Sequence, residues 1–127
     1  MTIEHIAVWS PDIEALKDFY EKYFEAKAGN KYYNPVKKFT SYFLTFTSGA
    51  RLEIMNIPEI EAKEQIYKQV GLAHFAVSTG SKEKVDTFTK FLEKEGVVIL
   101  SQPRTTGDGY YESVVLDPDG NQIEITI

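Results

Sequence analysis

The chain contains no cysteine and only two histidines among its 127 residues. Without cysteine there can be no disulfide bond and no thiolate ligand, so any metal site must use nitrogen and oxygen donors. No apolar run approaches the roughly 20 residues that a membrane-spanning helix needs, and residues 1–5 do not have the pattern of a signal peptide. We therefore expect a cytoplasmic protein.

The sequence also lacks any block rich in lysine or arginine. Its 19 acidic residues exceed its 14 lysines and arginines, which gives a formal net charge of -5. Nucleic acids and anionic membrane surfaces require a basic footprint that this pattern does not provide. The expected partners are a small-molecule substrate or another protein, with no nucleic acid and no membrane.

Two parts of the sequence repeat each other. The tetrapeptide His-Ile-Ala-Val at 5–8 recurs as His-Phe-Ala-Val at 74–77, and the segment at 48–54, which ends in Leu-Glu-Ile, recurs at 119–125, which ends in Ile-Glu-Ile. Each copy therefore carries one histidine and one glutamate in matching places. Two imidazoles and two carboxylates on equivalent strands are the ingredients of one metal site made from both halves.

The length of the chain is ordinary for one domain and too short for two independent globules. The repeat therefore predicts a single domain over residues 1–127 that is built from two halves. We place module 1 at about 1–58, a linker at about 59–71 and module 2 at about 72–127. The linker mixes charged and apolar residues in a spacing that allows one or two helical turns.

Module 1 is expected to contain a strand, a helix and further strands. Alternating apolar residues predict strands at 3–9, 40–46 and 51–57. The Ser-Pro-Asp segment at 10–12 supplies an N-cap, and apolar residues from 13 to about 24 recur at helical spacings of three and four. We place the end signal of this helix in the Ala-Gly-Asn segment at 28–30.

Module 2 follows the same order. Strands are predicted at 72–78, from 97–100 onward, at 110–116 and at 121–127, with an Asp-Pro-Asp-Gly turn at 117–120 between the last two. Ser81 caps a helix that ends at Gly96, and its apolar stripe is formed by Val85, Phe88, Phe91 and Leu92. Because neither module can cover its apolar sheet face alone, we expect the two sheets to combine into one curved surface with the helices outside.

These residues resemble a known family. A histidine on the first strand, a glutamate on the last strand, a second histidine and a final Asp-Pro-Asp-Gly-x-x-Ile-Glu segment at 117–124 are similar to the vicinal oxygen chelate superfamily, also called the glyoxalase/bleomycin-resistance/dioxygenase group. Its glyoxalase I-like (lactoylglutathione lyase-like) branch is the most similar. The resemblance implies an α+β fold in which two βαβββ modules form a cup-shaped mixed sheet with helices outside.

The resemblance also implies a metal centre. The four ligand positions of the glyoxalase I branch correspond to His5, Glu53, His74 and Glu124. Two imidazoles and two carboxylates suit a divalent metal such as Zn, Ni, Co, Mn or Fe. The alternative interpretation is that Leu52 and Ile54 face the core while Glu53 is simply a solvent-facing carboxylate on the convex face of the sheet.

The expected chemistry is a glyoxalase-type isomerisation. A divalent ion would bind adjacent oxygens of a small substrate and stabilise an enediolate, while a carboxylate moves the proton. By resemblance, Glu124 is the catalytic base, with Glu53 able to share this role. The resemblance further implies a homodimer, in which the modules that share a site come from one chain or from two.

The substrate is expected to differ from glutathione adducts. Where the glyoxalase I branch holds glutathione with an arginine and an asparagine, this sequence has Trp9 and Ile57. Trp9 indicates an apolar or aromatic wall, for another thiol adduct or an unrelated small molecule. Arg104 is a candidate anion contact, and Tyr111 is a further candidate for substrate binding.

Three other functions remain open at the level of the sequence. One is a ring-cleaving dioxygenase or an antibiotic thiol transferase of the same superfamily, which would use two histidines and one carboxylate. Another is a metal-free protein that binds a drug between its modules. The third is a metal-binding protein without catalysis. The intact set of four candidate ligands argues against the first two and leaves the third open.

Overall fold

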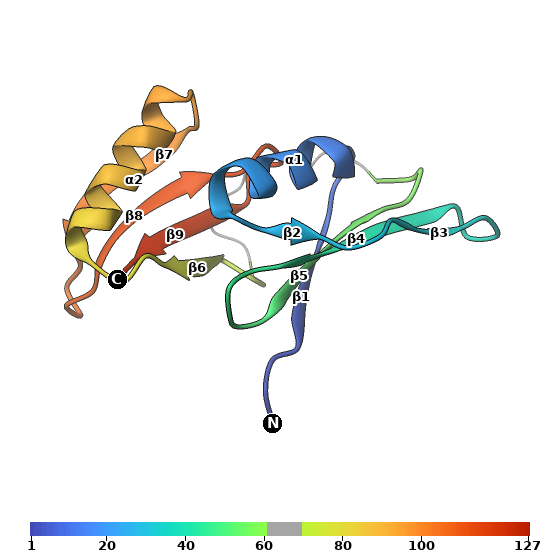
Figure 1. The fold of residues 1–127 in the computed structure, drawn as a ribbon, viewed down its shortest axis with the longest axis horizontal. Coiled ribbons are helices and arrows are strands. Elements are labelled where there is room, and N and C mark those ends of the chain that lie inside the picture. Colours follow the sequence, from blue (N-terminus) through green and yellow to red (C-terminus); the bar gives the residue numbers. More distant parts are fainter. Residues whose placement is uncertain (61–69) are drawn as a thin grey trace. The chain divides into compact units, whose positions relative to one another are not determined.

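The computed structural model describes residues 1–60 and 70–127. They form an α+β protein with two compact units, Met1–Lys63 and Glu64–Ile127 (Figure 1). The helical turns expected in the linker fall mainly on residues 61–69, which lie outside the described part of the chain. Neither of the two described helices has the length and apolar character needed to cross a membrane.

The first unit contains one helix and a mixed sheet. Its elements are β1 (His5–Trp9), α1 (Ile13–Phe24), β2 (Lys27–Ala28), β3 (Tyr32–Asn34), β4 (Phe39–Thr45) and β5 (Arg51–Asn56). The strand order is β1-β5-β4-β2, with β3 also paired to β4. β1 runs parallel to β5, whereas the other pairs are antiparallel. The polar segment before β4 contains β3, a short strand that the sequence pattern did not reveal.

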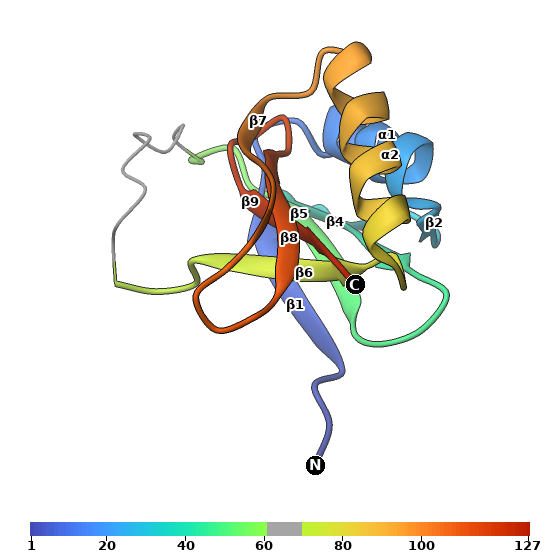
Figure 2. The ribbon, with the colours of Figure 1, turned by 90° about the vertical axis from the view of Figure 1, so that its left-hand side faces the viewer.

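The second unit repeats this topology without a counterpart of β3. Its elements are β6 (His74–Ser78), α2 (Lys82–Lys94), β7 (Ile99–Thr105), β8 (Tyr111–Leu116) and β9 (Gln122–Thr126). The strand order is β6-β9-β8-β7, and β6 runs parallel to β9. Figure 2 shows this unit with α2 along one side of its sheet. In both units the first strand lies beside the last, which confirms the prediction of two βαβββ modules.

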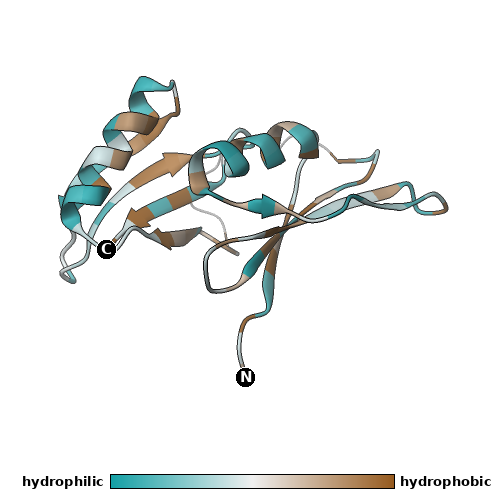
Figure 3. Cartoon of the chain, viewed as in Figure 1, coloured by the Kyte–Doolittle hydropathy of each residue, from teal (hydrophilic) through white to brown (hydrophobic). Residues whose placement is uncertain are grey.

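Each unit has its core between the helix and one sheet face. Leu52 and Ile54 on β5 and Ile123 and Ile125 on β9 are buried, and α1 and α2 contact the same strands. Figure 3 shows hydrophilic residues along both helices and hydrophobic segments along the central strands. Because side chains alternate along a strand, Glu53 and Glu124 lie on the faces that the helices leave open.

Helix α1 begins as predicted and ends earlier than its predicted end signal. The Asp12 carboxylate accepts hydrogen bonds from the backbone N–H groups of Glu14 and Ala15, at 3.1 and 3.0 Å. The helix ends at Phe24, followed by Glu25 in the left-handed conformation with φ 54. The predicted end at 28–30 is wrong, because Ala28 belongs to β2 and Gly29 donates a hydrogen bond to the Phe43 carbonyl.

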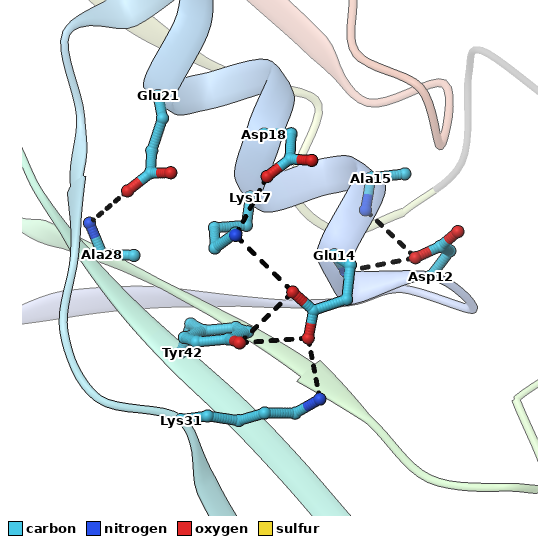
Figure 4. A network of polar contacts seen from close by, with 9 residues as sticks. All are labelled: Asp12, Glu14, Ala15, Lys17, Asp18, Glu21, Ala28, Lys31 and Tyr42. Carbon is cyan, nitrogen blue, oxygen red and sulfur yellow. Dashed lines mark hydrogen bonds and ion pairs between the residues drawn. The ribbon is translucent and has the colours of Figure 1, made fainter.

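A charged network fastens α1 to its sheet (Figure 4). Glu14 accepts hydrogen bonds from Lys31 at 2.7 Å and from the Tyr42 hydroxyl at 3.0 Å. The hydrogen bond from Lys31 is the largest effect that holds the pKa of Glu14 below its usual value. Tyr42 lies on the helix-facing side of β4, opposite Ile54, so the network closes the edge of the core.

Helix α2 departs from the predicted stripe. Val85 and Leu92 are buried as expected, but Phe91 is 46% exposed and Thr89 is fully buried. The Thr89 hydroxyl donates to the Val85 carbonyl at 2.7 Å, which leaves it to accept from Ser113 at 2.6 Å. These bonds satisfy the buried polar groups, and the stripe therefore runs through 85, 89 and 92.

Candidate functional site

The first histidine and the first glutamate lie side by side on the open face of unit 1. In the parallel pair of β1 and β5, His5 is opposite Arg51 and Ala7 is opposite Glu53. Glu53 therefore lies two residues further along β5 than Arg51, the residue opposite His5. Because side chains two residues apart point to the same side of a strand, His5 and Glu53 share a face of the sheet. His5 Nε2 lies 3.8 Å from Glu53 Oε2, and the Glu53 side chain is only 14% exposed.

The second pair has the same construction in unit 2. His74 is opposite Gln122 on β9, and Ala76 is opposite Glu124. His74 Nε2 lies 3.2 Å from Glu124 Oε1, with 18% of the Glu124 side chain exposed. The sequence repeat therefore corresponds to a repeat of geometry: each unit joins the first residue of its first strand to the third residue of its last strand.

The two glutamates are not freely solvated carboxylates. Glu53 points away from Leu52 and Ile54, which agrees with the alternative interpretation of a solvent-facing carboxylate. Most of its side chain is nevertheless buried. Burial raises the pKa of Glu124; the charge of His74 opposes this rise, and the nearby Glu112 carboxylate adds to it. A buried carboxylate is costly unless it is paired or bound to a metal, so both positions call for a cationic partner.

The donor atoms suit a divalent cation. Bonds of about 2.0–2.2 Å from nitrogen and oxygen place neighbouring ligands roughly 3.0–3.4 Å apart. The second pair, at 3.2 Å, falls within this range, whereas the first pair, at 3.8 Å, is wider. Within either unit, the described residues bring together no group of three or more His, Asp or Glu side chains that could hold a metal ion. Each unit therefore provides two of the four predicted donors.

Three residues that sequence analysis missed lie beside the first pair: Glu4, Arg51 and Phe43. His5 Nδ1 is 2.5 Å from the Glu4 carboxylate, and Glu4 also forms an ion pair with Arg51. The Arg51 guanidinium lies over the Phe43 ring, 4.1 Å from its centroid, and the His5 ring meets Phe43 edge-on. Strand alternation could have placed Phe43 on one face of the sheet. Only the structure shows that Arg51 and His5 are its neighbours there.

Trp9 shares the open face of β1 with His5. It is 50% exposed, and its ring makes an edge contact with Phe39 at 6.3 Å between centroids. Tyr32 adjoins Phe39 at 6.1 Å. Trp9 thus belongs to a cluster of three aromatic rings on the face that carries His5 and Glu53, and two of these rings come from β3 and β4.

Arg104 lies on the open face of unit 2. It is opposite Glu112 on β8, and Arg104 Nη1 is 3.2 Å from Glu112 Oε1. Glu112 is buried, at 8% exposure, and shares its face with Val114, which is opposite Glu124. The charges of both Arg104 and Glu112 act on the pKa of Glu124, in opposite directions. Arg104 is therefore on the same face as the second pair.

Tyr111 lies on the other face. It precedes Glu112 on β8, so its side chain points towards α2, where its hydroxyl donates to Asp86 at 2.6 Å. This hydrogen bond is the largest effect that raises the pKa of Tyr111, and Lys82 lies over its ring. The structure does not bring Tyr111 together with His74 and Glu124.

Two βαβββ units, each with a His and Glu pair on its open sheet face, define an α+β protein of the duplicated-module class. Residues 2–125 match the family model described as the Glyoxalase/Bleomycin resistance protein/Dioxygenase superfamily. The chain belongs to this superfamily. Comparison with curated proteins gave no significant match.

Solved structures share the fold. A glyoxalase family protein from Enterococcus faecalis is 24% identical, with a TM-score of 0.81 over 98% of this chain and 96% of that one. Glyoxalase I from Zea mays is 21% identical, with a TM-score of 0.81 over 98% of this chain and 44% of that one. The trypanothione-dependent glyoxalase I from Leishmania major is 22% identical, with a TM-score of 0.78 over 99% of this chain and 86% of that one.

Proposed function

We propose that the protein is a metal-dependent lyase or isomerase of the glyoxalase I type that acts on a small substrate with vicinal oxygens. The observation that carries this proposal is the repeated geometry of His5 with Glu53 and of His74 with Glu124. Membership of the superfamily and the likeness in fold to glyoxalase I structures support it.

In this proposal, His5, Glu53, His74 and Glu124 hold one divalent cation, which is Zn, Ni, Co, Mn or Fe. Two neutral imidazoles and two carboxylates give a site of nearly zero net charge, which matches the largely buried positions of both glutamates. When bound, the cation supplies Lewis-acid stabilisation of negative charge on adjacent substrate oxygens.

Glu124 is the proposed base. It removes the proton from the substrate carbon that carries the hydroxyl group, and the remaining electron pair forms an enediolate with the adjacent carbonyl. Glu124 then returns the same proton to the neighbouring carbon, while the hydroxyl proton passes to the former carbonyl oxygen. Both protons stay within the substrate, so the reaction is an isomerisation without a co-reactant. In the metal-free protein burial raises the pKa of Glu124, so its carboxylate is a stronger base when it is not bound to the cation. Glu53 occupies the equivalent place in the repeat and can share this role.

The surroundings indicate a substrate other than a glutathione adduct. Trp9 and Ile57 stand where the glyoxalase I branch holds glutathione, and Trp9 is joined to Phe39 and Tyr32 in an aromatic cluster. We expect this cluster to contact an apolar or aromatic part of the substrate. Among the described residues, Arg104 pairs with Glu112 through Nη1. Its other N–H groups would donate hydrogen bonds to a substrate anion.

We also propose that the chain acts as a homodimer in the cytoplasm. The four ligands come as two pairs, and in this superfamily the modules that share a site come from one chain or from two. Sedimentation analysis of the purified protein at micromolar concentration should give a dimer. A monomer with an intact metal site would refute the dimer and leave the metal proposal standing.

Metal analysis of protein purified without an affinity tag tests the proposed function directly. We expect one divalent ion per set of four ligands, followed by isomerisation of a hemithioacetal by protein loaded with Ni, Zn or Co. Glu59→Gln, at an exposed carboxylate in the loop after β5, is the matched control for Glu124→Gln. If no hemithioacetal of glutathione or of another small thiol is isomerised, the glyoxalase assignment fails.

A further inference from the structure

The first histidine has a carboxylate on the side of its ring that faces away from Glu53. Glu4 Oε2 lies 2.5 Å from His5 Nδ1, whereas His5 Nε2 is the atom nearest to Glu53. An ionised carboxylate only accepts hydrogen bonds, so the ring nitrogen beside Glu4 carries the hydrogen. Neutral His5 is then left with a bare lone pair on Nε2, which is the form that a metal ligand requires.

Glu4 is itself held in place. It forms an ion pair with Arg51, the residue directly opposite His5 across β1 and β5. The Arg51 guanidinium lies over the Phe43 ring, and the His5 ring packs edge-on to the same Phe43. These contacts join Glu4 and the His5 ring into one cluster, although 61% of the Glu4 side chain is exposed.

The second histidine lacks this arrangement. Ala73 stands in the place of Glu4, and Gln122 stands in the place of Arg51 opposite the histidine, so the second unit has neither the carboxylate nor the arginine that pairs with it. Among the described residues, the ionic partner of His74 is Glu124, which faces Nε2. Although the two pairs repeat each other, in the described part of the chain only His5 has a carboxylate beside its Nδ1.

We propose that Glu4 is a positioning residue that holds His5 as the Nδ1–H tautomer, with Nε2 free to bind a cation beside Glu53. Such a carboxylate behind a ligating histidine is typically worth a factor of about 10–100 in metal affinity. The inference deepens the proposed function and rests on it for the role of the metal. The tautomer itself is a property of the metal-free protein.

The chain is well suited to a direct test, because it has only two histidines. Long-range ¹⁵N–¹H NMR spectra of the metal-free protein at about pH 8.5, above the usual histidine pKa, distinguish the two tautomers of each ring. His74→Gln assigns the signals. We expect His5 to be mainly Nδ1–H and His74 to be mainly Nε2–H, the form favoured by free imidazole and by the position of Glu124.

Glu4→Ala should convert His5 to mainly Nε2–H, leave the His74 signals unchanged and weaken Zn²⁺ binding about 10- to 100-fold in a chelator competition. Glu4→Gln keeps an acceptor oxygen and should largely preserve both the tautomer and the affinity. Glu59→Ala, in an exposed loop, is the matched control.

Wild-type His5 in the Nε2–H form, or a His5 tautomer that does not respond to Glu4→Ala, would overturn the inference. Failure of the wild-type protein to bind Zn²⁺ or Ni²⁺ would instead overturn the proposed function. Because the NMR measurement needs no metal, the two failures can be told apart.

Discussion

The Nε2 atom of His74 lies 3.2 Å from Oε1 of Glu124, across the parallel strands β6 and β9. The same relationship joins His5 to Glu53 in the other unit, at 3.8 Å. A single such pair is an ordinary contact at a sheet surface. The repetition, on glutamates that are largely withdrawn from solvent, is what favours a metal site over a structural role.

Replacing Glu124 by Gln separates metal binding from catalysis. The amide keeps an oxygen donor and a similar volume but cannot act as a base, so we expect most of the metal to remain while turnover falls by about 10²-fold or more. Steady-state kinetics with metal content measured on the same sample provide the check. Equal turnover in the variant and the wild type would remove Glu124 from the proton transfer.

Removing either imidazole should affect the metal itself. His5→Ala and His74→Ala each delete one nitrogen donor, so both variants should lose most of their bound divalent ion under conditions in which Glu124→Gln retains it. Elemental analysis after gel filtration measures this loss. Full retention of the ion by His74→Ala would mean that the second pair is not part of the ligand set.

The Arg104 and Glu112 pair allows substrate binding to be separated from stability. Arg104→Met should leave the buried Glu112 carboxylate unpaired and lower the free energy of unfolding by roughly 1–3 kcal/mol. Adding Glu112→Leu should recover much of this loss. If Arg104 binds a substrate anion, both variants should show a raised KM. A normal KM in the doubly substituted protein would exclude this contact.

The Glu14 network predicts a pH-dependent contribution to stability. The pKa of Glu14 lies below its ordinary value, mainly because of the hydrogen bond from Lys31. Folding therefore favours the ionised form: the contribution is present above that ordinary value and is lost as the pH falls through the lower, folded-state pKa. Solvent weakens the pair, because 48% of the Glu14 side chain is exposed.

Glu14→Gln should accordingly lower the urea midpoint slightly at pH 7 and have little effect at pH 3. Lys31→Met tests the partner and should show the same dependence on pH. Denaturation curves at the two pH values provide the measurement. A loss of equal size at both would assign the effect to packing and not to charge.

The sequence was sufficient to predict the two modules, because strand alternation, the Asp12 and Ser81 caps and the repeated motifs are local signals. The common face of each His and Glu could also be expected, since both stand at matching positions of paired strands. What could not be predicted depends on tertiary packing. Phe91 has the spacing of a core residue, yet Thr89 is buried in its place through the hydrogen bond with Ser113.

The same limit applies to the surroundings of the site. Tyr111 and Glu112 are adjacent in sequence, but the pleat sends Tyr111 towards α2 and Glu112 to the face of Glu124. Their assignment depends on the register between β8 and β9, which composition does not reveal. Glu4 gave no signal for the same reason, because its role depends on the position of the His5 ring and on Arg51 in the neighbouring strand.

The central claim is that both pairs bind the same ion, and anomalous diffraction from crystals of the metal-loaded, tag-free protein tests it most directly. The proposal predicts one divalent ion bound by His5, Glu53, His74 and Glu124, with bonds of about 2.0–2.2 Å if the ion is zinc. An ion held by one pair alone, or four side chains that do not converge on any ion, would contradict it.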